Sequence, residues 1–530
     1  MPDLLIRGAW IIDGTGAGRR RADLAVTGGV ITEPDGAPAA RTIDADGLVL
    51  APGFIDMHAH SDLAVLTEPA HLAKVGQGVT SEVLGQDGLS YAPVDDDTLD
   101  RLRRQLAGWN GDPDGLAWDW RTVGQYLDRL DASGLAANAC YLVPHGTLRA
   151  LAVGWEDRPA TAAELARMRT LLAQGLREGA VGLSSGLTYT PGMYAPTAEL
   201  TELCRVVAAY GGYHCPHTRS YGAGALAAYA EMIEVSRRSG APLHLTHATM
   251  NFGVNAGRAE EFLALVDAAL ADGLDISLDS YPYLPGSTTL AALLPSWSTE
   301  GGPDRTLERL ADPAARARIR VDMEESGSDG CHGVVADWAT VQISGVRDPR
   351  LADRVGRTVA ELAGDGGATE AFLDLLVADR LGTTILQHVG HEPNVRAIMR
   401  HRVHTAGSDG LLTGARPHPR AWGTFPRYLG HYARELGVLT LEGAVARMTG
   451  RPARRLGLHR RGLIRRGYAA DLVLFDPLTV RDTATFEAPR RPAAGLPYVF
   501  VNGTAVIDDS RPTGALPGRT LRRRTTGETR

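Results

Sequence analysis

The hydrophobic pattern through the middle of the chain alternates between short apolar runs and longer amphipathic stretches. The apolar runs have the length of buried strands and lie at 51–57, 79–84, 139–144, 180–184, 212–216, 242–246, 274–279 and 403–407. Helical periodicity fills most of the intervals between them, as at 163–178, 198–210 and 258–271. Eight strands that alternate with helices predict a (β/α)₈ barrel, for which a doubly wound parallel sheet is the structural alternative.

Both ends of the chain have a different pattern, with short strands separated by turns. We expect residues 1–50 and 460–518 to pair as one small β-sandwich, because chain termini usually lie close together. The barrel would then span residues 51–459. The interval between the seventh and eighth strands is too long for one crossover, which predicts an inserted subdomain over residues 288–385. The polar tail 519–530 is expected to fray.

Composition places few limits on function but excludes some classes. The chain has 530 residues, 44% of them hydrophobic and 22% charged, which is typical of a globular protein. A net charge of −7 gives no sign of general nucleic-acid affinity. No apolar run reaches membrane-spanning length, and the N-terminus lacks the apolar core of a signal peptide. The four cysteines are scattered without metal-binding or disulfide spacing, so we expect a cytoplasmic protein.

Metal-binding side chains follow five of the predicted strands. The first strand ends in His58-Ala59-His60, and residues i and i+2 of a strand point to the same side. Four further strand ends carry Asp87, His217, His247 and Asp409. In a barrel these ends meet at the face where active sites form, and imidazole is the commonest metal ligand in proteins. The combination predicts a buried metal site.

Each of these residues has a simpler interpretation when taken alone. A lone histidine at a strand end is usually a hydrogen-bonded core residue. Asp87 lies in a glycine-flanked turn and Asp409 could cap a helix. His145 is either a hydrogen-bond partner of a metal ligand or a loop residue, and Cys215 is expected to be a small buried residue. Only the matched positions of the whole set favour the metal site.

Several longer motifs resemble one family. The chain is similar over nearly its whole length to the N-acyl-D-amino-acid deacylases (D-aminoacylases) of the amidohydrolase superfamily. The resemblance rests on APGFIDMHAHSD, GAVGLSSGLTYTPG, GGYHCPHTR, LHLTHA, LDSYPYLPGSTTL, HVGHEPNVRAIMRH, AGSDG, HPRAWGTFPRYLGHYARE and LEGAVARMTGRPARRLGL. It implies a metal-dependent hydrolase that cleaves an N-acyl-D-amino acid, or a related N-acylated amine, to a carboxylic acid and a free amine.

The resemblance also implies roles for individual residues. His217 and His247 correspond to ligands of a tightly held zinc ion. His58 and His60 correspond to the ligands of a second, more weakly held metal position. Asp409 corresponds to the catalytic carboxylate, which would take a proton from water and deliver it to the leaving amine.

One departure from the family concerns the metal ligands. The family usually has a cysteine in a GNCG turn after the second strand, where this chain has GQDG. Asp87 would therefore offer oxygen in place of sulfur, which makes the choice of metal less specific. The wider superfamily often bridges two metals with a carboxylated lysine, but the only lysine here, Lys74, precedes the second strand. We therefore expect Asp87 to be the shared ligand.

A second departure concerns the substrate. The family usually has a lysine that holds the substrate's α-carboxylate, and Thr249 stands in its place. The other pocket residues implied by the resemblance are Tyr189, Arg219, Tyr283 and Ser287. Arg219 could still bind a carboxylate, while the lost lysine leaves room for a modified or larger substrate.

Other functions would use the same barrel. A cyclic amidase or a deaminase of the same superfamily would need the same metal site. A binding scaffold that had lost its chemistry would be expected to have lost metal ligands as well, and here all of them are present. The sequence therefore favours the deacylase.

Overall fold

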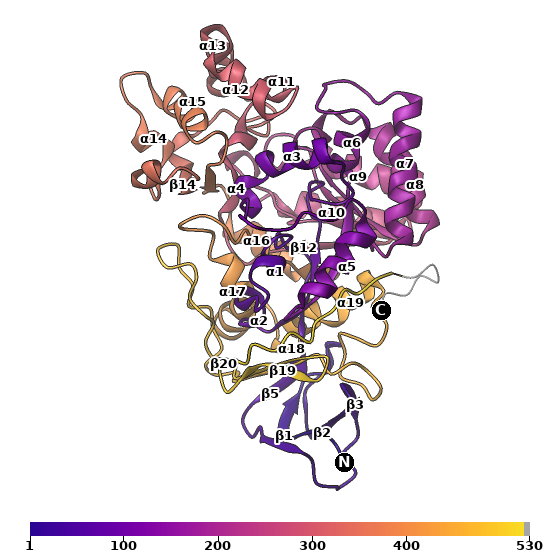
Figure 1. Cartoon of the computed structure of the whole chain (residues 1–530). Helices are drawn as coiled ribbons and strands as arrows, with labels where there is room; N and C mark the ends of the chain where they lie inside the picture. The colour runs from indigo at the N-terminus through magenta and orange to yellow at the C-terminus, as the bar shows by residue number, and fades with distance from the viewer. Residues whose placement is uncertain (524–530) are drawn as a thin grey trace.

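The computed structural model describes residues 1–523, and eight parallel strands form a barrel at its centre (Figure 1). In chain order these strands are β6 (Phe54–Asp56), β7 (Val79–Leu84), β8 (Asn138–Pro144), β9 (Gly182–Gly186), β10 (Tyr213–His217), β11 (Leu243–Leu245), β12 (Ile276–Ser280) and β16 (His404–Ala406). The amide N–H of Met57 donates to the carbonyl of Ala406 at 3.2 Å, which brings the last strand back to the first. The predicted barrel is confirmed.

The barrel strands are buried on both faces because helices cover the outside. Every residue of β7 is buried, as expected for a parallel strand inside an α/β fold. The covering helices include α5 (Val123–Ser133), α6 (His145–Ala152), α7 (Ala162–Arg177), α8 (Thr197–Ala209), α9 (Ala225–Ser239), α10 (Ala259–Ala271), α16 (Glu392–Arg400), α18 (Leu441–Met448) and α19 (Gly450–Leu456). Reciprocal side-chain caps at Thr122 and Thr161 fix where α5 and α7 begin. No helix within residues 1–523 has both the length and the apolarity to cross a membrane.

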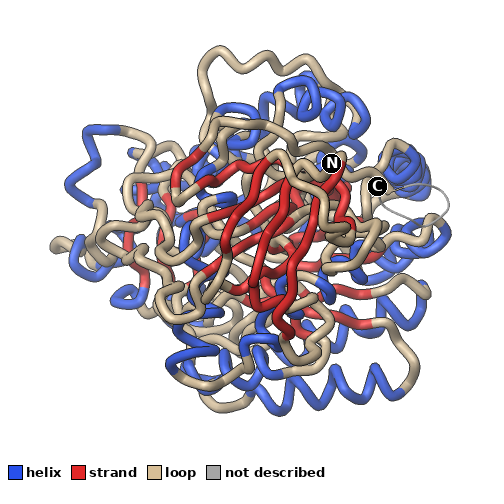
Figure 2. The backbone as a smooth tube through the Cα atoms, turned by 90° about the horizontal axis from the view of Figure 1, so that it is seen from below, coloured by secondary structure: helices blue, strands red, loops and turns tan. Residues whose placement is uncertain are grey.

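The two chain ends form one mixed sheet of nine strands below the barrel (Figure 2). Its strands are β1 (Leu4–Ile11), β2 (Arg20–Thr27), β3 (Val30–Thr32), β4 (Arg41–Asp44), β5 (Val49–Pro52), β17 (Leu472–Phe475), β18 (Tyr498–Val501), β19 (Thr504–Asp508) and β20 (Arg511–Pro512). Antiparallel pairing of β5 with β17 joins the N-terminal half to the C-terminal half. The two termini, which were predicted to pair as one small β-sandwich, thus form one continuous mixed sheet.

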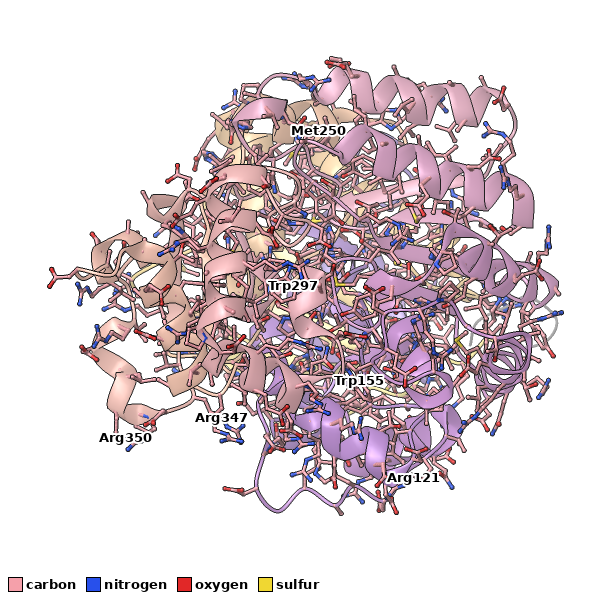
Figure 3. The ribbon with its side chains drawn as sticks, turned by 90° about the horizontal axis from the view of Figure 1, so that it is seen from above. Arg121, Trp155, Met250, Trp297, Arg347 and Arg350 are labelled. Atoms are coloured by element: carbon pink, nitrogen blue, oxygen red, sulfur yellow. The ribbon has the colours of Figure 1, made fainter. Side chains whose placement is uncertain are left out.

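The long interval between β12 and β16 contains a second, smaller sheet. Its strands are β13 (Gly286–Thr289), β14 (Val341–Gly345) and β15 (Thr384–Gln387). The accompanying helices are α11 (Ser296–Thr299), α12 (Pro303–Ala311), α13 (Pro313–Val321), α14 (Val359–Leu362) and α15 (Ala368–Ala378). Leu310, Ile319 and Phe372 belong to a hydrophobic core of this insertion. Seen from above, Trp297 lies near the centre of the molecule and Arg347 and Arg350 lie towards its left edge, so the insertion extends from over the barrel to one side of it (Figure 3).

The expectation that the tail frays is wrong for its first residues. The Leu521 side chain is 1% exposed and packs with barrel residues such as Leu142. Thr520 donates through both its backbone N–H and its hydroxyl to the carboxylate of Asp131. One apolar side chain in a polar stretch is a weak sequence signal, yet it anchors this segment. The remainder of the predicted tail, residues 524–530, lies outside the described residues.

Candidate metal centre

Polar side chains from five strand ends meet at the carboxyl-terminal end of the barrel. The strand ends contribute His58 and His60 after β6, Asp87 after β7, His217 at the end of β10, His247 after β11 and Asp409 after β16. All six side chains belong to buried residues that are at most 7% exposed. The structure therefore brings together all the residues that the sequence predicted as ligands and catalytic carboxylate.

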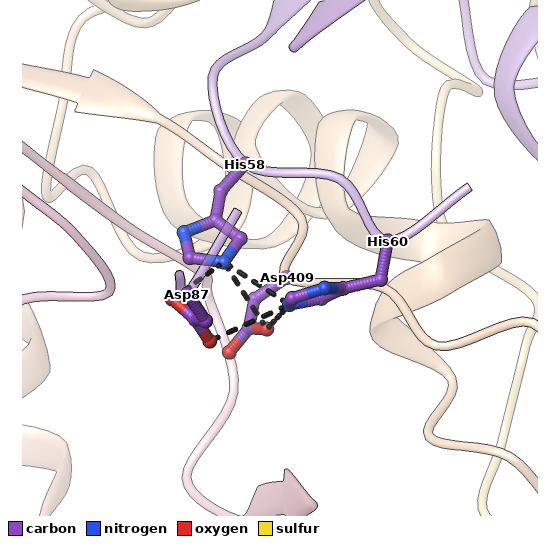
Figure 4. Close-up of side chains that lie close together, drawn as sticks. All are labelled: His58, His60, Asp87 and Asp409. Atoms are coloured by element: carbon purple, nitrogen blue, oxygen red, sulfur yellow. Dashed lines mark hydrogen bonds and ion pairs between the residues drawn. The ribbon is translucent and has the colours of Figure 1, made fainter. Parts of the chain in front are cut away.

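His58, His60, Asp87 and Asp409 form a first group of candidate ligands (Figure 4). The Nε2 atoms of His58 and His60 are 3.2 Å apart. Oδ1 of Asp409 lies 3.1 Å from Nε2 of His60 and 3.6 Å from Nε2 of His58. The Asp87 carboxylate approaches the same two nitrogens at 3.5 and 3.6 Å. One donor atom from each of the four side chains thus lies within 4.8 Å of the other three.

Asp87, His217 and His247 form the second group. Nδ1 of His217 and Nε2 of His247 are 3.0 Å apart. Each of these nitrogens lies 3.4 Å from one oxygen of Asp87. Within the described residues Asp87 is the member common to both groups. Its two carboxylate oxygens therefore face both candidate metal positions.

The donor atoms fit metal ions in their type and spacing. Ligand atoms about 2.0–2.1 Å from a tetrahedral zinc ion are about 3.3–3.4 Å from one another. The nitrogen–nitrogen and nitrogen–oxygen distances given for the two groups run from 3.0 to 3.6 Å. Oδ1 of Asp87 and Nδ1 of His58 are buried without a hydrogen-bond partner among the described residues. Imidazole and carboxylate donors suit zinc and similar divalent ions.

Electrostatics keep the two carboxylates in their ionised, ligand-competent form. Burial alone would raise the pKa of Asp87, but the surrounding imidazoles outweigh burial and hold this pKa well below its usual value. Burial is outweighed at Asp409 as well, where Arg420 and the imidazoles lower the pKa. Because metal ligands must be deprotonated, both groups are ready to bind a cation near neutral pH.

The backbone is strained at three of the six candidate residues. Asp87, His247 and Asp409 have positive φ angles of 53°, 29° and 48°. Residues other than glycine rarely adopt this region, and such strain gathers at functional sites. Flanking glycines at Gly85, Gly88 and Gly410 permit close packing around these turns. The positive φ angles let each of these turns direct its side chain towards the same site.

The only lysine, Lys74 on α2 (Leu72–Val75), links two of the segments that carry candidate ligands. Its Nζ donates to Asp56 at 2.6 Å and to the Ser408 hydroxyl at 2.8 Å, and all three side chains are buried. Oδ1 of Asp56 accepts from the backbone N–H groups of His58 and Ser408. One ion pair thus fixes the segments that carry His58 and Asp409.

We expect Lys74→Met to lower the free energy of unfolding by about 3 kcal/mol, because it leaves Asp56 charged and buried without its partner. Denaturant unfolding measures this change. The double variant Lys74→Met/Asp56→Asn removes both charges and keeps the acceptor at Asp56, so it should be more stable than the single variant. Equal stability of the wild type and Lys74→Met would contradict the role of this ion pair.

A pocket adjoins the two ligand groups, and barrel and insertion both line it. Two of the predicted pocket residues, Tyr189 and Ser287, line this pocket. Thr249, which stands where the family usually has a lysine, lines it as well. The Tyr189 hydroxyl lies 3.0 Å from that of Thr288, which ties the barrel to the insertion. The Thr249 hydroxyl donates to Asn251. This position therefore offers hydroxyl and amide groups to a ligand and no positive charge.

Three predicted residues lie away from this pocket. The Arg219 guanidinium is held by Glu231 and by backbone carbonyls, including that of Met193 at 3.0 Å. The Tyr283 hydroxyl donates to Asp482. His145 bonds to Glu199 at 2.8 Å and to none of the candidate ligands among the described residues. None of the three is among the residues that line the pocket.

Sequence reasoning missed Arg420, the first residue of α17 (Arg420–Arg427). Its Nη2 atom lies 2.9 Å from Oδ2 of Asp409, and its guanidinium stacks over the ring of Tyr281 at 4.3 Å. The Arg420 side chain is fully buried, and its Nε and Nη1 atoms have no hydrogen-bond partner among the described residues. The HPRAWG motif contained this arginine, but no predicted strand end pointed to it.

Comparison with known proteins gives one family for the whole chain. A profile described as the amidohydrolase family matches residues 41–507. D-aminoacylase from Alcaligenes xylosoxydans xylosoxydans is 38% identical over 528 residues, which cover 98% of both chains.

Solved structures agree with this result. A D-aminoacylase structure described with a binuclear metal centre superimposes with a TM-score of 0.83 at 36% identity, covering 99% of this chain and 100% of the other. N-acyl-D-glutamate deacylase from Bordetella bronchiseptica, in complex with zinc and a phosphonate inhibitor, gives a TM-score of 0.84 at 35% identity, covering 98% and 99%.

Proposed function

The chain belongs to the amidohydrolase family, and we propose that it hydrolyses the amide bond of N-acyl-D-amino acids to a carboxylic acid and a free D-amino acid. The observation that carries this proposal is the pair of ligand groups joined by Asp87, with Asp409 facing them. D-aminoacylase and N-acyl-D-glutamate deacylase resemble this chain from end to end, which supports the choice of substrate class.

We propose zinc as the metal, held tightly by Asp87, His217 and His247. A second and weaker position would use His58 and His60, again with Asp87. The solved relatives with a zinc ion and with a binuclear centre support this assignment. A bound zinc ion would lower the pKa of water towards about 7 and polarise the substrate carbonyl.

The chain's own residues would supply the proton transfers and the positioning. Asp409 is ionised, so its Oδ1 atom can accept a proton from the attacking water and later donate it to the leaving amine. Arg420 holds Oδ2 of the same carboxylate, which leaves Oδ1 directed at the ligand groups. The six candidate side chains are buried, and burial strengthens each of these electrostatic interactions.

Arg420 lies behind the pocket wall, where it contacts the lining residues Asp409 and Ser287, and it is also the candidate partner for the substrate's α-carboxylate. Its Nε and Nη1 atoms are buried without partners, and Nη2 contacts the backbone of Ser287 beside the pocket. Arg219, which sequence reasoning favoured for this role, has its guanidinium occupied by Glu231. A guanidinium with free N–H groups is well suited to a carboxylate.

Replacement of Arg420 by Gln should therefore lower kcat/KM more for N-acetyl-D-amino acids than for their methyl esters. We expect the ratio of kcat/KM for acid over ester to fall at least about tenfold, the loss expected for one charge-assisted hydrogen bond. Steady-state kinetics on matched acid and ester substrates measure this ratio. Arg219→Gln serves as the matched control and should leave the ratio unchanged. If Arg219→Gln changed the ratio and Arg420→Gln did not, the two assignments would have to be exchanged.

Product analysis tests the reaction type. The proposal predicts one carboxylic acid and one free amine from each N-acyl-D-amino acid, and little turnover of the L-enantiomers. A single ring-opened product from a cyclic amide would indicate a cyclic amidase, and released ammonia would indicate a deaminase. Either result, without deacylation, would contradict the proposal.

We also propose that the protein works in the cytoplasm. All four cysteines are buried and none forms a disulfide, which supports a reducing compartment.

A further inference from the structure

A separate cavity of ≈ 400 Å³ lies at the amino-terminal end of the barrel, opposite the metal centre. The starts of four strands, β10, β11, β12 and β16, contribute Tyr213, Pro242, Ile276 and Val403 to its wall. Helix α19 closes one side of it. The volume falls within the range of about 300–1,000 Å³ that is typical of small-molecule sites. None of the candidate metal ligands lines this cavity.

The described lining of this cavity is strongly basic. Its charged residues are Arg402, Arg451, Arg454, Arg455, Arg523 and one acid, Asp275. Asp275 is already bound by Arg455, whose guanidinium nitrogens lie 2.6 and 3.1 Å from its two oxygens. Arg402 pairs with Asp267 at 2.8 Å. These two pairs leave Arg451, Arg454 and Arg523 without an acidic partner among the described residues.

Arg451, Arg454 and Arg523 have no ion pair with any described residue. Arg451 donates to the backbone carbonyl of His404, which carries no formal charge. Nε of Arg523 is buried without a hydrogen-bond partner among residues 1–523. Burial lowers the pKa of Arg451 and of Arg523, and the neighbouring Arg454 lowers that of Arg451 further. Arg451 and Arg523 are partly buried and Arg454 is exposed, so the three line the cavity with positive charge that a bound anion would neutralise.

We propose that this cavity is a binding site for a small phosphate-bearing anion, held by Arg451, Arg454 and Arg523. Phosphate carries more than one negative charge and offers several acceptor oxygens, which guanidinium groups bind in pairs. A monocarboxylate would neutralise only one of the three arginines. The site is separate from the metal centre, so the proposal does not depend on the proposed deacylase reaction.

Isothermal titration of the purified, zinc-loaded full-length protein at constant ionic strength tests the proposal. The two probes are inorganic phosphate and glycerol 3-phosphate, so that free phosphate and a phosphate ester are distinguished. We expect at least one of them to bind with a Kd of about 1 mM or below. Arg451→Gln and Arg454→Gln should each raise this Kd about tenfold, as for loss of one charge-assisted hydrogen bond.

The matched control is Arg350→Gln, at the outer edge of the insertion (Figure 3). It removes the same charge far from the cavity and should leave the Kd unchanged. Arg454 is exposed, so its replacement is expected to leave the fold intact, and unchanged kcat/KM for deacylation would verify this. The absence of binding by both probes would overturn the proposal. Binding that Arg451→Gln and Arg454→Gln leave unaltered would also overturn it, because it would place phosphate outside this cavity.

Discussion

Replacement of Asp409 by Asn is expected to lower kcat by about 10³-fold, while at least one metal ion per chain is retained. The amide keeps the shape of the carboxylate but cannot accept the proton of the attacking water. Asp409 does not belong to the second ligand group, which consists of Asp87, His217 and His247, so this group stays complete in the variant. Steady-state kinetics together with metal analysis of the same sample measure both effects.

Asp508→Asn is the matched control for this prediction, because Asp508 pairs with Arg41 in the terminal sheet. It should leave kcat unchanged. Near wild-type turnover by Asp409→Asn with its metal bound would show that another group carries the proton. Loss of all metal from Asp409→Asn would instead show that Asp409 is mainly a ligand.

Replacement of Asp87 by Ala is expected to weaken metal binding at both positions, because Asp87 is shared by the two ligand groups. Loss of a residue that only hydrogen-bonds to a metal ligand lowers metal affinity by up to about 100-fold. Asp87 is itself a candidate ligand, so we expect its loss to lower the zinc affinity by more than this. Hydrolysis should fall with it. Competition with a zinc-binding dye measures the affinity.

The substitutions His60→Ala and Asp87→Cys sharpen this test. His60 belongs to the first group alone, so His60→Ala should leave the tighter position filled. Asp87→Cys restores a ligand of a type that zinc favours and should recover tight binding of at least one ion. If Asp87→Ala kept two ions per chain, the shared-ligand assignment would be wrong.

The strands and the residues at their ends could be predicted from sequence, because both follow from short-range rules. An apolar run of a certain length predicts a buried strand, and parallel strands place their carboxyl ends on one side. His58, Asp87 and Asp409 are separated by up to 351 positions in the chain, yet each lies just after a strand, so topology alone brings them together.

The arginine that faces the site could not be predicted in this way. Arg219 follows a barrel strand directly and so had the right local context, but a partner on α9, Glu231, turns it away. Arg420 reaches Asp409 from the start of α17, and that position depends on how α17 packs against α2, an element more than 340 positions earlier in the chain. Such contacts between distant elements have no short-range signal.

The tyrosines of the YPY motif illustrate the same limit. Tyr281 lines the pocket, whereas Tyr283 donates to Asp482, which lies in the chain segment between β17 and β18. Both lie beyond the end of β12, where the alternation of a strand no longer determines the side on which each residue points. The motif could be found in the sequence, but only the packed structure shows which of its two tyrosines lines the pocket.

Zinc titration of the chelator-treated protein, with hydrolysis of an N-acetyl-D-amino acid and of its L-enantiomer as the readout, tests the central claim most directly. We predict that activity towards the D-substrate is lost on chelation, returns fully with about one zinc ion per chain, and greatly exceeds activity towards the L-substrate. Undiminished hydrolysis after complete metal removal, or equal rates for the two enantiomers, would contradict the account.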